Sequence, residues 1–287
     1  MKMRHLRLTK GEKVLYTIII SLFSIYSVTL IFPFVWAFLT SLKTQQEYIE
    51  NSPFALPELW KFVNYAKAFD ALEVHNTKLV GMFFNSLWYS VGMVVGNVFV
   101  CSLGAYVLSR YPFKGSNGIY HAILIMMLMP IIGNGPSAFR VYGQLGLLNN
   151  PLFVISNWGI MGTNFLFLYA FYSNVSWAYA EAAFIDGAGH FKVYFKIMFP
   201  QALSIISALA IMQFVGYWND YATPLLYFPK LPTLATGIYE YEKSMIRGAN
   251  MPVYFAGLLI SVVPVLILFF SFQNTVMDKI SLGGLKG

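Results

Sequence analysis

Few side chains in this sequence are of the types that carry out covalent chemistry, and they lie far apart. Cys101 is the only cysteine, so the chain alone cannot form a disulfide or a thiolate metal cluster. Its place inside an apolar run predicts a small buried hydrophobic residue. A phosphate loop of the GxxxxGK[ST] type is absent. The histidines are scattered without metal-ligand spacing, at His5, His75, His121 and His190. We therefore predict no catalytic residue, no metal site and no cofactor bound by this chain, which is not expected to be an enzyme.

The segment of residues 181–200, EAAFIDGAGHFKVYFKIMFP, has the character of a docking element. Helical spacing predicts one apolar stripe, formed by Phe184, Ala188, Phe191, Phe195 and Met198. Charged residues lie off that stripe, at Glu181, Asp186, Lys192 and Lys196. Gly187 and Gly189 predict a break where two short helices meet. From the residues alone, two interpretations stay open: a helix pair lying on lipid, or one inserted into a groove of a soluble partner.

Ionisable side chains are nearly absent from the apolar stretches, so the relay of carboxylates and histidines expected of an ion-coupled transporter is missing. Energy for any transport must then come from outside this chain. Candidates for lining a solute cavity are Asn134, Tyr142, Trp218, Asn219 and Asp220. Such residues can equally cap helices or contact a partner.

Composition places these residues in a membrane. With 57% hydrophobic residues, 11% charged residues and a mean hydropathy of +0.61, the chain cannot expose its whole surface to water. Membrane topology explains the net charge of +7 better than a nucleic-acid partner does. Apolar runs long enough to span a bilayer predict an all-α polytopic membrane protein with six transmembrane helices, at 14–39, 80–108, 118–139, 152–174, 201–224 and 253–273.

The distribution of lysine and arginine predicts the orientation of these spans. Positive residues precede the first span, which is too long for a cleaved signal peptide and is interpreted as an anchor. Both termini are then cytoplasmic. The loop at 40–79 is external and includes a run at 58–69 that predicts a short amphipathic helix on the outer face. The loop at 177–199 and the tail at 274–287 are cytoplasmic, and residues 1–287 form a single transmembrane domain.

Prolines and glycines interrupt some of the spans. Pro33 and Pro264 are single prolines that predict kinks in otherwise apolar helices. The third span ends in a richer set, Pro130, Gly133, Gly135 and Pro136. This set predicts either a broken helix that lines a cavity or a helix that ends early and leads into an outer loop.

The pattern EAA, two residues, DGA, and a proline nineteen positions after the glutamate resembles the EAA loop of permease subunits of binding-protein-dependent ABC importers. It is matched by Glu181, Ala182, Ala183, Asp186, Gly187, Ala188, Ile197 and Pro200. Further stretches resemble the smaller, six-span permease of the maltose-type carbohydrate importers. They are FNSLWYS at 84–90, GAYVLSRYPFKG at 104–115, MP at 129–130, LGLLNNP at 145–151, FVGYWNDYATPLL at 214–226 and the C-terminal LGGLKG. The likeness covers nearly the whole chain, in order.

This resemblance implies a type I ABC importer permease in the cell membrane, paired with a homologous permease and two ATPase subunits that bind ATP and Mg²⁺. The coupling helices would place Glu181, Ala182, Ala183, Asp186, Gly187 and Ala188 in a cleft of an ATPase. A second ATPase contact would be the tail, Leu282, Gly283, Gly284, Leu285, Lys286 and Gly287. An external binding protein would deliver a sugar, expected to be an oligosaccharide, for transport by alternating access. A non-sugar solute or an ion-coupled secondary transporter is the alternative.

Overall fold

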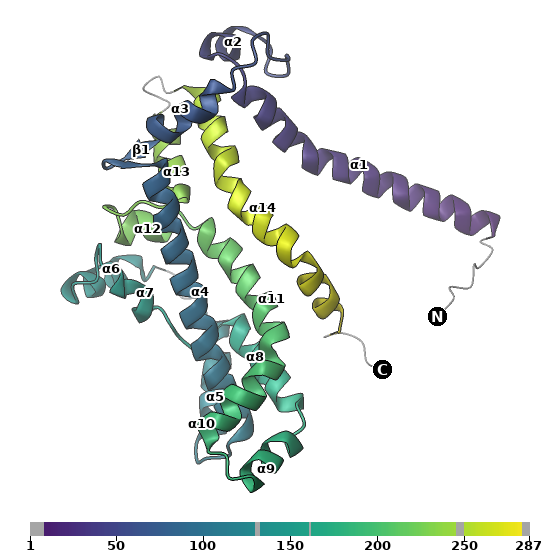
Figure 1. The fold of residues 1–287 in the computed structure, drawn as a ribbon, viewed down its shortest axis with the longest axis vertical. Coiled ribbons are helices and arrows are strands. Elements are labelled where there is room, and N and C mark those ends of the chain that lie inside the picture. Colours follow the sequence, from purple (N-terminus) through teal and green to yellow (C-terminus); the bar gives the residue numbers. More distant parts are fainter. Residues whose placement is uncertain (1–8, 130–132, 161, 245–249, 283–287) are drawn as a thin grey trace. The chain divides into compact units, whose positions relative to one another are not determined.

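The computed structural model describes the chain except residues 1–8, 130–132, 161, 245–249 and 283–287 (Figure 1). It is helical as predicted, and its described strands are the short β1 (Glu73–Val74) and β2 (Thr77–Lys78). These strands pair antiparallel around His75 and Asn76, both at positive φ, as a two-residue hairpin turn requires. The chain divides into two compact units, residues 1–71 with 242–260 and residues 72–241 with 261–287.

The first unit contains α1 (Lys10–Ser41), α2 (Gln45–Glu50), α3 (Val63–Ala71) and the beginning of α14 (Met251–Leu282). The Asn64 side-chain amide donates to the carbonyls of Ser41 and Lys43, each at 2.8 Å, and so satisfies free carbonyls where α1 ends. Trp36 contacts Phe255 edge to face at 5.1 Å, which packs α1 against α14. The amphipathic helix predicted within residues 58–69 corresponds to α3, which begins at Val63 rather than at residue 58.

Glu47 organises the connection between α1 and α3. It forms a capping box with Thr44 at the start of α2, and its Oε1 accepts the backbone N–H groups of Glu58 and Leu59, each at 3.1 Å. Burial raises the pKa of Glu47, but the hydrogen bonds from Thr44, Leu59 and Glu58 outweigh burial and hold it below the ordinary 4.5. The ionised carboxylate is thus the form that joins α2 to residues 58–59.

The second unit is built around α4 (Leu79–Arg110), α8 (Thr163–Asn174) and α11 (Phe199–Trp218), which pack along one another (Figure 1). Glycines on α4 admit bulky side chains from the segment before α8. A Cβ on Gly96 would lie 1.8 Å from the Trp158 ring, and one on Gly104 would lie 2.6 Å from Ile160. Small residues at these positions allow close packing in a membrane-spanning bundle.

Two predicted spans are not single helices. The stretch 118–139 divides into α5 (Ser116–Leu128) and α6 (Gly135–Gln144), and 152–174 divides into α7 (Leu152–Ser156) and α8. Gly133 and Gly162 adopt φ values of 82° and 94°, which interrupt a right-handed helix. At the first break the helix ends at Leu128, before Pro130, which lies outside the described residues.

The remaining predicted spans correspond to the described helices that are long and apolar enough to cross a bilayer. These helices are Lys10–Ser41, Leu79–Arg110, His190–Trp218 and Met251–Phe272, and Ser116–Leu128 is a shorter apolar helix. The predicted span 201–224 was wrong at both ends, because the helical run begins at His190 and α11 stops before α12 (Ala222–Tyr227). Pro33 and Pro264 lie inside α1 and α14. The last described element before α14 is α13 (Leu234–Ser244).

Candidate functional site

The predicted docking segment folds as two helices joined at a sharp turn. It consists of α9 (Ala178–Ile185), α10 (His190–Val193) and a π-helical turn, η1 (Tyr194–Met198), that continues into α11. The N–H of Ala188 donates to the carbonyl of Ala183 at 2.9 Å, and the N–H of Gly187 donates to that of Phe184 at 3.0 Å. With Gly187 at φ 77°, this is a Schellman cap. Local sequence therefore produces the bend that the glycines predicted.

The turn exposes both acidic and apolar side chains. Glu181 and Asp186 are exposed and have no hydrogen-bond or ion-pair partner among the residues that the structure describes. Tyr179, Ile185 and Phe191 are 58%, 86% and 76% exposed. Large exposed apolar residues beside unpaired acids are typical of a surface that contacts another protein.

The apolar stripe predicted across residues 184–198 was wrong for the second helix. Phe191 and Phe195 are exposed, whereas Val193, Tyr194 and Met198 are buried. The left-handed residue Gly187 and the wide turn of η1 both change the helical phase, so positions counted at regular spacing across them do not share a face.

An aromatic cluster anchors the docking segment to the end of α4. The Tyr111 hydroxyl lies 2.9 Å from Nδ1 of His190, and the Phe184 and His190 rings are 5.0 Å apart. Trp177 packs edge to face against Tyr111 at 6.0 Å. The Arg110 guanidinium lies 5.7 Å from the centre of the Trp177 ring and donates to the carbonyl of Val175. Sequence reasoning assigned no role to His190, although it lies at this junction.

A second, buried layer connects the same elements further along α4. The Tyr194 hydroxyl donates to Ser102 Oγ at 3.0 Å, and Ser102 Oγ lies 2.8 Å from the Tyr172 hydroxyl. Tyr106 packs against both tyrosine rings, at 5.0 and 5.5 Å. This arrangement joins α4, α8 and η1 through hydrogen bonds and ring contacts.

Comparison with known proteins identifies the family to which this helical bundle belongs. The family described as binding-protein-dependent transport system inner membrane component matches residues 6–281. The chain belongs to this family. As a member, it is a membrane-spanning permease subunit.

Similar proteins support the assignment along nearly the whole length of the permease. It is 30% identical over 267 residues to the diacetylchitobiose uptake system permease protein NgcG of Streptomyces coelicolor, covering 92% of this chain and 86% of that one. It is 27% identical to the arabinooligosaccharides transport system permease protein AraQ of Bacillus subtilis, covering 95% and 96%. A bacterial ABC transporter involved in the import of the acidic polysaccharide alginate has the same fold, with a TM-score of 0.79, 19% identity and coverage of 94% and 99%.

The solute-contact candidates occupy different environments in the permease. Trp218 is buried and donates to the carbonyl of Ser261 at 3.0 Å. Tyr142 packs between Phe153 and Tyr227, at 4.7 and 5.2 Å. Both side chains therefore have packing roles in this structure.

The other three candidates lie at helix ends. Asn134 is exposed just before α6, and Asn219 is exposed at the end of α11, where its amide donates to the carbonyl of Val215 at 2.8 Å. Asp220 accepts a hydrogen bond from the Tyr89 hydroxyl at 2.9 Å and from the backbone N–H of Thr223 at 3.0 Å. Of these three, Asp220 is therefore the one whose side chain links α4 to the segment between α11 and α12.

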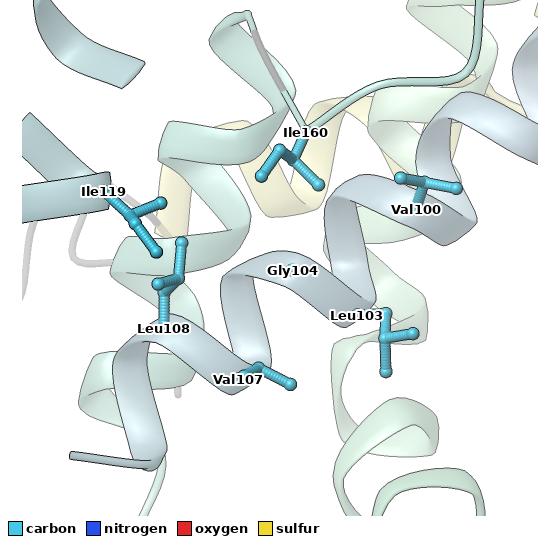
Figure 2. A pocket seen from close by; sticks show the side chains of 7 residues that line it. All are labelled: Val100, Leu103, Gly104, Val107, Leu108, Ile119 and Ile160. Atoms are coloured by element: carbon cyan, nitrogen blue, oxygen red, sulfur yellow. The ribbon is translucent and has the colours of Figure 1, made fainter. Parts of the chain in front are cut away.

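A shallow pocket of about 320 Å³ lies on α4, beside α5 (Figure 2). Figure 2 shows Ile160 reaching toward Gly104 on the α4 ribbon, with Ile119 projecting from α5. The lining is apolar: Val100, Leu103, Gly104, Val107, Leu108, Ile119 and Ile160. Such a surface offers no partner for a hydroxyl group and suits a hydrocarbon chain rather than a sugar.

The remaining sequence predictions concern Cys101, metal-ligating side chains and the tail. Cys101 is fully buried, and its Sγ donates to the carbonyl of Gly159 at 3.1 Å, in keeping with a packed interior residue. No group of three or more metal-ligating side chains occurs in the described part of the chain. Leu282 is the last residue of α14, and the rest of the predicted tail contact, 283–287, lies outside the described residues.

Proposed function

We propose that the permease is one of two homologous membrane subunits of an ATP-driven importer for an oligosaccharide. The observation that carries this proposal is the exposed turn around Gly187, with Ile185 86% exposed and the acidic Glu181 and Asp186 unpaired among described residues. An anionic lipid surface would repel these carboxylates, whereas a protein groove with basic or backbone donors would bind them. This favours a soluble protein partner over lipid.

The partner that fits this turn is an ABC ATPase, one for each permease of the heterodimer, with ATP and Mg²⁺ bound by the ATPases. ATP binding closes the ATPase pair and displaces α9. The Tyr111–His190 junction and the buried tyrosines then carry the displacement to α4 and α8. The permease performs no covalent step. Its two global states differ in their affinity for the ATP-bound ATPase pair, which is what drives alternating access.

The membrane orientation follows from the same site. An ATPase acts in the cytoplasm, so α9 and α10 are cytoplasmic, together with Arg110, which contacts Trp177 and Val175 just before α9. The distribution of lysine and arginine in the sequence predicts that both termini are cytoplasmic as well. Residues 40–79 are then external, where a solute-binding protein delivers the sugar. A solved relative is described in complex with an alginate pentasaccharide-bound periplasmic protein, which supports this arrangement.

An oligosaccharide is the substrate class best supported by the relatives, whose names specify diacetylchitobiose and arabinooligosaccharides. The decisive experiment reconstitutes the permease with its partner permease, ATPases and binding protein in lipid vesicles. Uptake of labelled diacetylchitobiose is measured with ATP present, with ATP depleted, and with ion gradients collapsed. The proposal requires uptake that stops without ATP and continues without gradients, and uptake that follows the ion gradient would overturn it.

The docking assignment is tested in the same vesicles. Replacing Glu181→Lys and Asp186→Lys together is expected to abolish ATPase association and uptake. The control for ATPase association is Glu50→Lys on α2, in the other unit, which should leave association unchanged. If the double variant imports sugar like the native complex, the docking surface lies elsewhere.

A further inference from the structure

Three carboxamide side chains from three helices meet at one point. Nε2 of Gln213 on α11 donates to Oδ1 of Asn97 on α4 at 3.0 Å, and Nδ2 of Asn164 on α8 approaches the same oxygen at 3.4 Å. Asn97 lies close to the midpoint of α4. We call Asn97, Asn164 and Gln213 the amide cluster. Polar groups at this depth in a membrane helix are costly and face the bundle interior or a water-filled path.

The hydrogen bonds of the amide cluster are unevenly distributed. Three donors approach Oδ1 of Asn97, the third being Sγ of Cys101 at 3.7 Å, although an amide oxygen has two acceptor positions. Oε1 of Gln213 is buried and has no partner in the described residues. A cluster that only held helices together would pair its own groups. In the amide cluster, by contrast, Oε1 of Gln213 is an acceptor without a partner in the described residues, and Nδ2 of Asn164 is a donor in a long hydrogen bond.

One turn after Gln213, α11 is open at Gly216. Gly216 is exposed, and a side chain there would meet nothing within 4 Å. Tyr217 is four residues after Gln213 and Asp220 is seven after it, spacings that keep both close to the same helical face. Tyr217 contacts Tyr89 edge to face at 6.1 Å, and Tyr89 donates to Asp220. Polar side chains therefore extend from Gln213, five residues before the end of α11, to Asp220 just beyond that end.

This chemistry selects a neutral hydroxylated ligand. A sugar hydroxyl can donate to Oε1 of Gln213 while accepting from Nδ2 of Asn164, and a sugar ring can pack on Tyr217. Anionic sugars are bound through arginine or lysine, and none contributes to the amide cluster. The charged group on this face is the carboxylate of Asp220, which disfavours an anion.

We propose that the amide cluster is a sugar-binding subsite at mid-membrane depth in the translocation path, and that it favours neutral over acidic sugars. This proposal rests on the proposed sugar import. The competing explanation is that the face around Gly216 is covered by the partner permease or by lipid, and the first experiment below decides between them.

Cysteine labelling reports whether the face is a water-filled path. Cys101 is the only cysteine and is fully buried, so a new cysteine gives a clean signal. In the reconstituted complex, Gly216→Cys should react with a charged, water-soluble thiol reagent. Val95→Cys, at a 61% exposed apolar position of α4, should not. If Gly216→Cys is unreactive both with and without ATP, the face is covered and the proposal is overturned.

Protection by sugars tests the ligand class. Diacetylchitobiose delivered by its binding protein should slow the labelling of Gly216→Cys by about tenfold when present at about ten times its dissociation constant. Digalacturonate, of equal length but acidic, should not slow it. If neither sugar slows the labelling, the proposal of a sugar-binding subsite is overturned. If the acidic sugar protects equally well, the proposed preference for neutral sugars is wrong.

A pair of matched substitutions tests the amide itself. Gln213→Leu should lower the sugar transported per ATP hydrolysed by about tenfold, because a substrate hydroxyl loses its partner. Gln201→Leu is the control, since Gln201 is on the same helix and bonds the carbonyl of Ile197 at 3.2 Å. Equal transport by the native protein and Gln213→Leu overturns the subsite, whereas absence of uptake by the native complex overturns the proposed function instead. If Gln213→Leu fails to assemble, the Gly216→Cys result decides.

Discussion

The hydroxyl oxygen of Tyr111, the residue that caps α4, lies 2.9 Å from Nδ1 of His190, the first residue of α10. This contact connects a long membrane helix directly to the docking segment. With the Phe184 and Trp177 rings packed beside it, the junction makes the end of α4 and the base of the exposed turn one body. The importance of this contact, and of the helix caps and packing contacts described above, can be tested by substitution.

His190→Ala is expected to reduce coupling between ATP hydrolysis and transport. It removes the hydrogen bond to Tyr111 and the ring contact with Phe184, so the sugar transported per ATP should fall by about fivefold, equivalent to about 1 kcal/mol of lost anchoring. His121→Ala is the control, because the His121 ring nitrogen lies 2.6 Å from the carbonyl of Asn117 within its own helical segment. If the amount of sugar transported per ATP is unchanged in His190→Ala, the contact between Tyr111 and His190 does not transmit movement.

Gly187→Ala is expected to weaken the cap of α9. At φ 77° an alanine Cβ is strained by about 1 kcal/mol, so amide exchange at residues 183–188 should become about fivefold faster. Gly189→Ser is the comparison, since Gly189 has φ −75° at the start of α10, where serine is a favourable N-cap. Hydrogen-exchange mass spectrometry of the solubilised permease measures both. Similar acceleration in the two variants would contradict the cap assignment.

Gly96→Ala and Gly118→Ala should change stability in opposite directions. A Cβ on Gly96 would meet the Trp158 ring, whose Nε1 is fixed by the carbonyl of Gly92 at 3.1 Å, so destabilisation of about 1–3 kcal/mol is expected. Gly118, in α5, has open space around it, and alanine should stabilise the helix by up to about 1 kcal/mol. Thermal unfolding followed by circular dichroism measures both shifts. If Gly96→Ala does not lower stability, Trp158 moves freely away from the added methyl group.

Acid should loosen the connection between α1 and α3. The folded-state pKa of Glu47 lies below 4.5, so its stabilising contribution is complete above pH 4.5 and is lost as the pH falls through the lower folded-state value. Exchange at the Glu58 and Leu59 amides, corrected for intrinsic pH dependence, should accelerate in that range. Glu47→Gln should show fast exchange already at neutral pH. Glu50→Gln is the control and should behave like the native protein, since Glu50 bonds only Gln46 among described residues.

Hydropathy predicted the long helices well because their apolar runs are unbroken. The span 80–108 differs from α4 by only a few residues. Prolines and glycines at 130–136 indicated the break near Gly133, but the break at Gly162 was not predicted, because a positive φ depends on the surrounding packing and leaves no mark on mean hydropathy. The count of six spans was predicted from the apolar runs and stays a prediction, because four described helices are long and apolar enough to cross a bilayer.

The docking turn was predictable and its anchor was not. Gly187 and the EAA pattern are local signals, whereas the contact of His190 with Tyr111 joins residues far apart in the chain. A signal for Asn97, Asn164 and Gln213 was present, because carboxamides within apolar runs are unusual. The search for ionisable groups passed over them, although neutral amides can bind neutral ligands without any charge.

The π-helical turn at Tyr194–Met198 has a consequence for the rotation of α11 about its own axis. Here the backbone N–H of Phe199 bonds the carbonyl of Tyr194, so the turn contains one residue more than an α-helical turn. Removing a residue would rotate everything after it by about 100° and would turn Gln213 away from Asn97. The length of this turn therefore sets the angular alignment between the proposed ATPase-docking surface and the proposed sugar-binding face.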